Sequence, residues 1–351
     1  METAAHKQAR QVGRNGVPVG SCAGRPTLLR FESSKVIGID WGERGAKAPN
    51  DVRPKKAPER RIPERVQVGD RHRRVPGIQG GAVQEYLFRS SQRPRPLPVG
   101  RWAISQRWND LLFAHWAFSP PRLAPLLPDW LEVDTYQGKG WLGAVPFWLD
   151  RVKVRNVPSL PGVRSFPDLT LRTYVRDRFT GTPGVYCFSM DASNLLAVGV
   201  ARTLYHLPYH WAEMRLEARS EREFAIFSRR RMAHREVIFK ARYRGLGPTC
   251  RTVEMRPGSF EYFITERSWL FSANQAGQPI RASLHYIPWP LEEAEAEIER
   301  NDLPASIGLE LQEPEPVLHY SRRMAVYIWP PELMRPVLAR RPVAAVAAPL
   351  G

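Results

Sequence analysis

Residues 204–214 read LYHLPYHWAEM and gather two histidines, two tyrosines and a tryptophan around one proline. His206 and His210 are four residues apart, and two histidines at this spacing share a zinc ion when they lie on one face of a helix. Pro208 stands between them and breaks such a helix. In a strand the two side chains would lie about 13 Å apart, too far for one ion with bonds of about 2.1 Å. We therefore expect no metal site here.

A second group of reactive side chains lies in residues 166–177, FPDLTLRTYVRD. Strand alternation places Asp168, Thr170, Arg172 and Tyr174 on one face and the leucines on the other. Such a polar face is either exposed to solvent over an apolar core or turned into the lumen of a barrel. The local sequence leaves both interpretations open.

The elements that must position these residues begin near residue 100, because the composition changes there. Residues 1–99 hold 20 lysines and arginines against nine acidic residues, and only four of the 36 aromatic residues. A chain segment rich in charge and proline cannot bury enough apolar surface to fold alone. We therefore predict a basic, disordered extension over 1–99, or a native start near residue 100. The net charge of +17 belongs mainly to this segment.

The three cysteines, Cys22, Cys187 and Cys250, are too few and too scattered for a disulfide framework or a zinc site, and they fit a reducing compartment. No apolar run approaches the roughly 20 residues that span a bilayer, and the N-terminus lacks the apolar core of a secretory signal. These features predict a cytoplasmic protein without a membrane partner.

From residue 100 onward, apolar alternation and turn signals predict strands with short helices between them. The expected strands are 107–118, a hairpin over 131–155 turning at Gly138–Gly140, 166–178, 184–190, an antiparallel meander of 213–220, 223–231 and 235–244, two strands around 273–278, and 323–329. The expected helices are 119–128, 193–205, 259–268 and 290–302. This inventory predicts a β-dominated α+β domain over 100–335, a curled or closed antiparallel barrel. Residues 336–351 read as a flexible tail.

Four blocks of this domain carry a resemblance to a known family. The first block runs from WNDLLFAHW to LLPDWLEVDTYQGKGWLGAVPFWLDRV. The next two are FPDLTLRTYV and GVYCFSMDASNLLAVGVARTLYHLPYHWAEM, and the last is LHYIPWPLEEAEAEI. Together they resemble the YqjF-like family of the acetoacetate decarboxylase-like superfamily over about 101–330. The resemblance implies a β-barrel with a central cavity for a small ligand. It therefore favours the lumen for the face of Asp168 and Arg172.

Acetoacetate decarboxylase itself forms a Schiff base on a lysine, which a neighbouring lysine activates in a Gly-Tyr-Pro-Lys-Lys segment. The segment that resembles it here is YHLPYHW, in which Tyr209 and His210 stand where the lysines would be. Neither side chain forms an imine. Lys139, Lys153 and Lys240 are the remaining lysines after residue 100, and their turn and strand contexts predict solvated side chains. The resemblance therefore argues against Schiff-base decarboxylation and implies no cofactor.

A candidate cavity remains, and Asp168 falls where the decarboxylase carries a glutamate. Arg172 is suited to hold a carboxylate or enolate oxygen. His210 and Asp168 are the candidate catalytic residues, as a general acid or base. The other candidate ligand-binding residues are Tyr174, Tyr209, His115 and His285.

Three functions follow from this reading. The leading hypothesis is a protein that binds a small anionic or carbonyl-bearing molecule. The first alternative is an acid/base enzyme acting on a keto or enol substrate, and the second is nucleic-acid association through the basic extension. No aromatic stacking pattern accompanies that extension, which weighs against the nucleic-acid reading. Catalysis and a homo-oligomeric state are left open.

Overall fold

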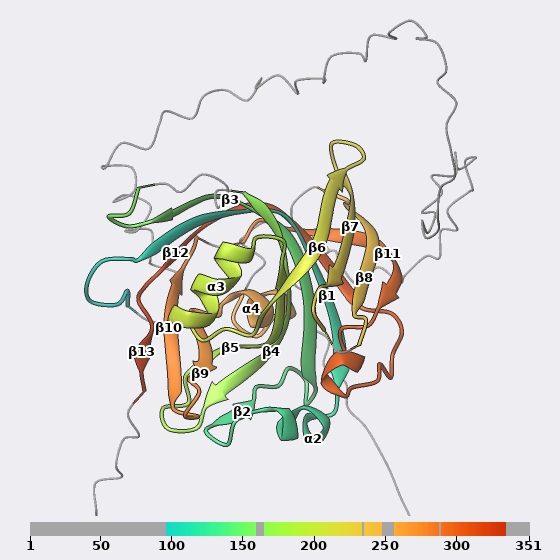
Figure 1. The fold of residues 1–351 in the computed structure, drawn as a ribbon. Helices are drawn as coiled ribbons and strands as arrows, with labels where there is room; N and C mark the ends of the chain where they lie inside the picture. Colours follow the sequence, from blue (N-terminus) through green and yellow to red (C-terminus); the bar gives the residue numbers. More distant parts are fainter. Residues whose placement is uncertain (1–95, 159–164, 234, 248–255, 288, 335–351) are drawn as a thin grey trace, which may run out of the picture. The chain divides into compact units, whose positions relative to one another are not determined.

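The computed structural model describes residues 96–158, 165–233, 235–247, 256–287 and 289–334. Strands dominate this part of the chain (Figure 1). The strands are β1 (Ile104–Phe118), β2 (Leu131–Val133), β3 (Gly140–Val154), β4 (Phe166–Asp177), β5 (Pro183–Ala192), β6 (Tyr209–Ala218), β7 (Glu223–Arg230), β8 (Ile238–Gly245), β9 (Trp269–Ala273), β10 (Pro279–His285), β11 (Leu291–Asn301), β12 (Val317–Ile328) and β13 (Glu332–Leu333). The β-dominated fold is therefore confirmed.

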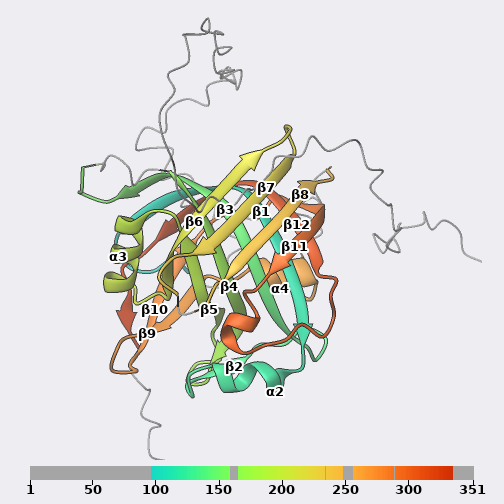
Figure 2. The same cartoon turned by 45° about the vertical axis from the view of Figure 1, so that its right-hand side comes forward.

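These strands form one sheet in the order β13-β10-β9-β5-β6-β7-β8-β11-β12-β1-β3-β4-β2. The sheet curls back on itself because β4 also pairs with β5 and β10 also pairs with β12. The pairs are antiparallel with two exceptions, since β5 runs parallel to both β6 and β9. The prediction of a curled antiparallel sheet is confirmed, apart from these two short parallel pairings. In Figure 2 the long strands β6, β7 and β8 cross in front of β4 and β5.

The long strands bury both of their faces, in two different apolar clusters. The first cluster includes Phe113, Val145 and Phe147. The second cluster fills the space between β1, β3 and β4 on one side and β6, β7 and β8 on the other, and includes Leu171 and Ile226. Leu169 and Leu171 of β4 thus lie in one cluster while Tyr174 lies in the other, as the alternation predicted.

The expected short helices over 119–128, 193–205 and 259–268 are present as α2 (Pro120–Leu123) with the 3-10 turn η1 (Ala124–Leu126), α3 (Leu195–Leu204) and α4 (Phe260–Thr265). The Asn194 side chain caps α3 by accepting a hydrogen bond from the amide of Ala197, and Ser259 caps α4 in the same way. A further 3-10 turn, η2 (Ala305–Ile307), precedes β12.

The helix predicted over 290–302 is the strand β11, and that prediction was wrong. The glutamates suggested a helix N-terminus, but Ala294, Ala296 and Ile298 also repeat with the period of a strand. β11 pairs with β8, whose arginines meet its glutamates in ion pairs, such as that between Arg244 and Glu295. The tertiary partner thus outweighs the local preference for a helix.

The hairpin predicted over 131–155 is also wrong in its pairing. A turn closes with a bridge between Tyr136 and Lys139, but β2 pairs with β4 and β3 pairs with β1 and β4. Residues 1–95 and 335–351 lie outside the described residues, and with them nearly all of the basic extension and the tail. None of the described helices is long and apolar enough to cross a membrane.

Candidate functional site

A cavity of about 200 Å³ lies on the side of the sheet where β1, β3, β4, β5 and the helix α3 face one another. Its wall is mostly apolar, with Trp108, Phe147 and Leu284 among the lining residues. The polar lining residues are Gln106, Thr170, Arg172, Tyr205 and Tyr209. The β4 face of Asp168, Thr170, Arg172 and Tyr174 is thus turned inward rather than towards solvent.

Arg172 is the only charged side chain among the described residues that line this cavity. It stands at a register shift in the pairing of β4 with β5, an irregularity that often re-aims a side chain beside a functional site. The guanidinium lies 5.5 Å from the ring centroid of Phe113 and 5.7 Å from that of Tyr174. Its Nη2 donates a long hydrogen bond of 3.5 Å to the Tyr174 hydroxyl, while its buried Nε has no hydrogen-bond acceptor. Arg172 forms no ion pair with any described carboxylate.

Asp168 lies behind Tyr209 and is fully buried. The Tyr209 hydroxyl donates a hydrogen bond of 2.8 Å to Oδ2, and the Thr170 hydroxyl donates a weaker one of 3.4 Å to Oδ1. Burial raises the pKa of Asp168 to about 7, and the carboxylate of Asp191 adds to the rise, while the two hydrogen bonds oppose it. Burial also raises the pKa of Tyr209 well above its usual value. Asp168 therefore exchanges a proton near neutral pH and contacts the cavity through the Tyr209 phenol.

His115 and Tyr174 form a buried pair next to Arg172. The His115 Nε2 and the Tyr174 hydroxyl are 2.6 Å apart, and both side chains are fully buried. Burial, followed by the nearby charges of Arg172 and His319, lowers the pKa of His115 well below its usual value. The imidazole is consequently neutral at physiological pH. A neutral imidazole next to Arg172 does not compete with it for an anion.

None of the three histidine candidates lines the described part of the cavity wall, although His115 lies next to Arg172, which does. Tyr209 and His210 are successive residues of β6, so they point to opposite sides of the sheet, and His210 is exposed. Partial desolvation and the cations Arg230 and Arg202 lower the pKa of His210 to about 4. His285 is buried at the end of β10, opposite Tyr327 of β12. Neither histidine belongs to the described cavity wall.

No lysine lines the described cavity wall either. Lys139 lies in a turn and forms an exposed ion pair with Glu313, and Lys240 pairs with Glu299 on the outer face of β8. Lys153 is exposed on β3. The described residues contain no group of three or more histidine, cysteine or acidic side chains that could hold a metal ion.

Sequence comparison relates this chain to a known family. A family model described as an uncharacterized conserved protein, DUF2071, matches residues 105–325. The chain is 40% identical over 243 residues to the "Uncharacterized protein YqjF" of Bacillus subtilis, which covers 69% of this chain and 97% of that protein. The chain belongs to the DUF2071 family.

Two solved structures are similar to the DUF2071 chain at low sequence identity. The acetoacetate decarboxylase of Legionella pneumophila has a TM-score of 0.45 and 14% identity, covering 71% of this chain and 94% of its own. The enduracididine biosynthesis enzyme MppR, complexed with pyruvate, has a TM-score of 0.49 and 12% identity, covering 68% and 93%.

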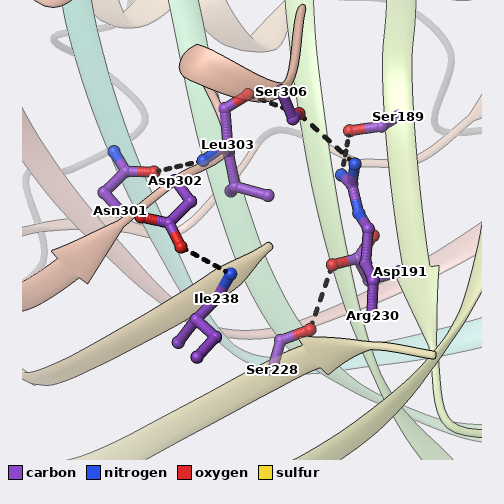
Figure 3. Close-up of polar contacts among 9 residues, drawn as sticks. All are labelled: Ser189, Asp191, Ser228, Arg230, Ile238, Asn301, Asp302, Leu303 and Ser306. Atoms are coloured by element: carbon purple, nitrogen blue, oxygen red, sulfur yellow. Dashed lines mark hydrogen bonds and ion pairs between the residues drawn. The ribbon is translucent and has the colours of Figure 1, made fainter. Parts of the chain in front are cut away.

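The sequence reading missed one buried polar group of this DUF2071 domain, which Figure 3 shows. Arg230 of β7 donates hydrogen bonds to Asp191 and Ser189 of β5, at 2.7 and 2.6 Å, and a longer one to Ser306. Ser228 donates to the other oxygen of Asp191. The signal was present, because strand alternation places Arg230 on the same face of β7 as the buried Phe224 and Ile226. The ion pair between Arg230 and Asp191 links β7 to β5 across β6, which lies between them in the sheet.

Proposed function

We propose that this protein binds a small carboxylate- or carbonyl-bearing molecule in the cavity beside β4, with Arg172 holding the negatively charged oxygen. The observation that carries the proposal is an inward-facing guanidinium without a carboxylate partner among the described residues, next to a neutral imidazole. Even partial burial of a cation is costly unless a counter-charge compensates it, so a protein that keeps the half-buried Arg172 in a cavity wall is poised to receive an anion.

The test is calorimetric titration of small carboxylates and β-keto acids into the wild-type protein and an Arg172→Gln variant. Loss of a charge-assisted hydrogen bond costs about 1.5–3 kcal/mol, or roughly ten- to a hundredfold in Kd. An Arg281→Gln variant serves as the matched control, because Arg281 pairs with Glu332 and does not line the cavity. Equal affinities of the wild-type protein and the Arg172→Gln variant would refute the proposal.

A second candidate function rests on the Asp168–Tyr209 hydrogen bond. A carboxyl whose pKa lies near 7 is suited to acid/base chemistry, and Tyr209 relays it to the cavity. We propose proton transfer to or from the carbon next to a carbonyl group as the matching reaction class. The test is exchange of that proton for solvent deuterium in a keto acid, followed by NMR. Tyr209→Phe is expected to abolish exchange while binding persists, and exchange at the wild-type rate would exclude the relay.

A further inference from the structure

The cavity wall limits the kind of molecule that the Arg172 site can receive. Among the described lining residues, the aromatic and aliphatic side chains far outnumber the polar ones. Of the polar ones, Gln106 accepts a hydrogen bond from the Trp108 indole and Tyr209 donates to Asp168, so both already have partners. A small hydrophilic acid would satisfy Arg172 but leave most of the wall without an apolar contact.

The volume of the cavity sets the size of the apolar group that fills it. An apolar cavity of about 150 Å³ takes up benzene, so a cavity of about 200 Å³ corresponds to a ring or chain of about six to eight carbons. Burying each methylene group contributes about 0.8 kcal/mol, which is roughly a fourfold decrease in Kd.

The cavity has an inner and an outer end. Arg172 lies at the inner end, against the fully buried Phe113 and Tyr174. The helix α3 lies at the outer end, because Leu196 and Val200 line the cavity and are also 53% and 39% exposed. A helix that is apolar on nearly every side is normally buried, so these exposed side chains mark an apolar mouth rather than a solvated surface.

We propose that the ligand is an amphipathic monocarboxylate, whose carboxylate meets Arg172 and whose apolar chain or ring of about six to eight carbons extends to α3. This inference rests on the proposed function at the same site and adds the apolar group as the determinant of specificity. A ligand whose alkyl chain is longer than the cavity extends past Leu196 and Val200 of α3 into solvent.

Titration of straight-chain carboxylates from acetate to dodecanoate, with pyruvate and acetoacetate, tests the inference. Kd is expected to decrease about fourfold per methylene up to about eight carbons and then to level off. Octanoate is expected to bind at least a hundredfold more tightly than pyruvate. If pyruvate and octanoate bind equally and both depend on Arg172, the apolar group is excluded while the proposed function stands. If no carboxylate binds, or octanamide binds as well as octanoate, the proposed function fails and this inference with it.

Two variants of α3 locate the apolar group. Ala201 lines the cavity, so Ala201→Leu is expected to move the optimal chain length down by about two carbons. Leu195 is 60% exposed and does not line the cavity, so Leu195→Ala is expected to keep the wild-type profile. Leu196→Ala, at an exposed position where folding is not at risk, is expected to weaken decanoate several-fold and leave butyrate unchanged. Unchanged chain-length profiles in both Ala201→Leu and Leu196→Ala would overturn this placement.

Discussion

The hydroxyl of Tyr209 donates a 2.8 Å hydrogen bond to the buried carboxyl of Asp168, so the residue that faces the cavity and the residue that titrates near neutral pH are different side chains. The strand β6 supplies the phenol and β4 supplies the carboxyl. These two strands are not paired in the sheet, and β5 lies between them. The hydrogen bond between Tyr209 and Asp168 therefore reaches across β5, which pairs with β4 on one side and β6 on the other.

The raised pKa of Asp168 predicts a pH dependence of stability. In the unfolded chain this carboxyl ionises near 3.8, whereas in the folded protein it keeps its proton until about pH 7. Its contribution to the free energy of unfolding is thus fully present below about pH 4 and is lost as the pH rises to 7, with a slope of at most about 1.4 kcal/mol per pH unit. Urea unfolding of the wild-type protein and Asp168→Asn at several pH values measures it.

The Asp168→Asn variant keeps an oxygen that can accept from Tyr209, and it is expected to lack this part of the pH dependence. Asp129→Asn, at an exposed position, controls for the removal of one carboxyl group. Parallel curves for the wild-type protein and Asp168→Asn between pH 4 and 7 would show that Asp168 does not titrate in this range.

The lowered pKa of His115 predicts an effect of opposite sign. Below pH 6.5 the unfolded chain binds a proton that the folded imidazole refuses, so this contribution to stability is lost as the pH falls below 6.5. The His115 ring resonances in NMR spectra are expected to stay constant between pH 5 and 8. A titration of this ring with a midpoint near 6.5 would contradict its burial next to Arg172.

The buried Arg230 and the half-buried Arg172 allow the cost of a functional charge to be separated from the contribution of a structural one. Arg230 is matched by Asp191, so Arg230→Met leaves an uncompensated buried carboxylate and is expected to cost about 3–5 kcal/mol of stability. Arg172 has no such partner among the described residues, so Arg172→Met is expected to change the free energy of unfolding of the ligand-free protein by less than about 1 kcal/mol, or to increase it. Chemical denaturation of both variants tests this contrast. An equally large loss for Arg172→Met would indicate a structural role.

Much of this site follows from the sequence because it depends on local alternation. The period of β4 assigned Asp168 and Arg172 to one face, and the same rule, applied to β6, separates Tyr209 from His210. The sequence reading nevertheless grouped Tyr209 with His210, because the resemblance aligned both with one reactive segment. Strand alternation along β6 was therefore sufficient to exclude His210 from the face that carries Tyr209.

The remaining features depend on partners that are distant in the sequence. β11 is a strand because Arg242 and Arg244 of β8 face its glutamates, and no local pattern identifies β8 as its neighbour. The parallel pairing of β5 with β6 likewise follows from the path of the chain through α3. Strand alternation places Arg230 on the buried face of β7, but its partner Asp191 on β5 follows only from the tertiary structure. These are long-range contacts, which local propensity does not encode.

The close approach of Gly143 to His115 supplies a last prediction. A Cβ atom at position 143 would lie 2.9 Å from Nε2 of His115, the atom that contacts the Tyr174 hydroxyl. The fully buried imidazole must therefore move and lose that hydrogen bond in Gly143→Ala, which is expected to lower the free energy of unfolding by about 1–3 kcal/mol.

Gly199 of α3 is the matched control, because a Cβ atom at this position would have no atom within 4 Å. Gly199→Ala is therefore expected to raise the free energy of unfolding by about 0.5–1 kcal/mol. Urea unfolding of the two variants should therefore give changes of opposite sign, and a Gly143→Ala protein as stable as the wild type would show that His115 has room to shift.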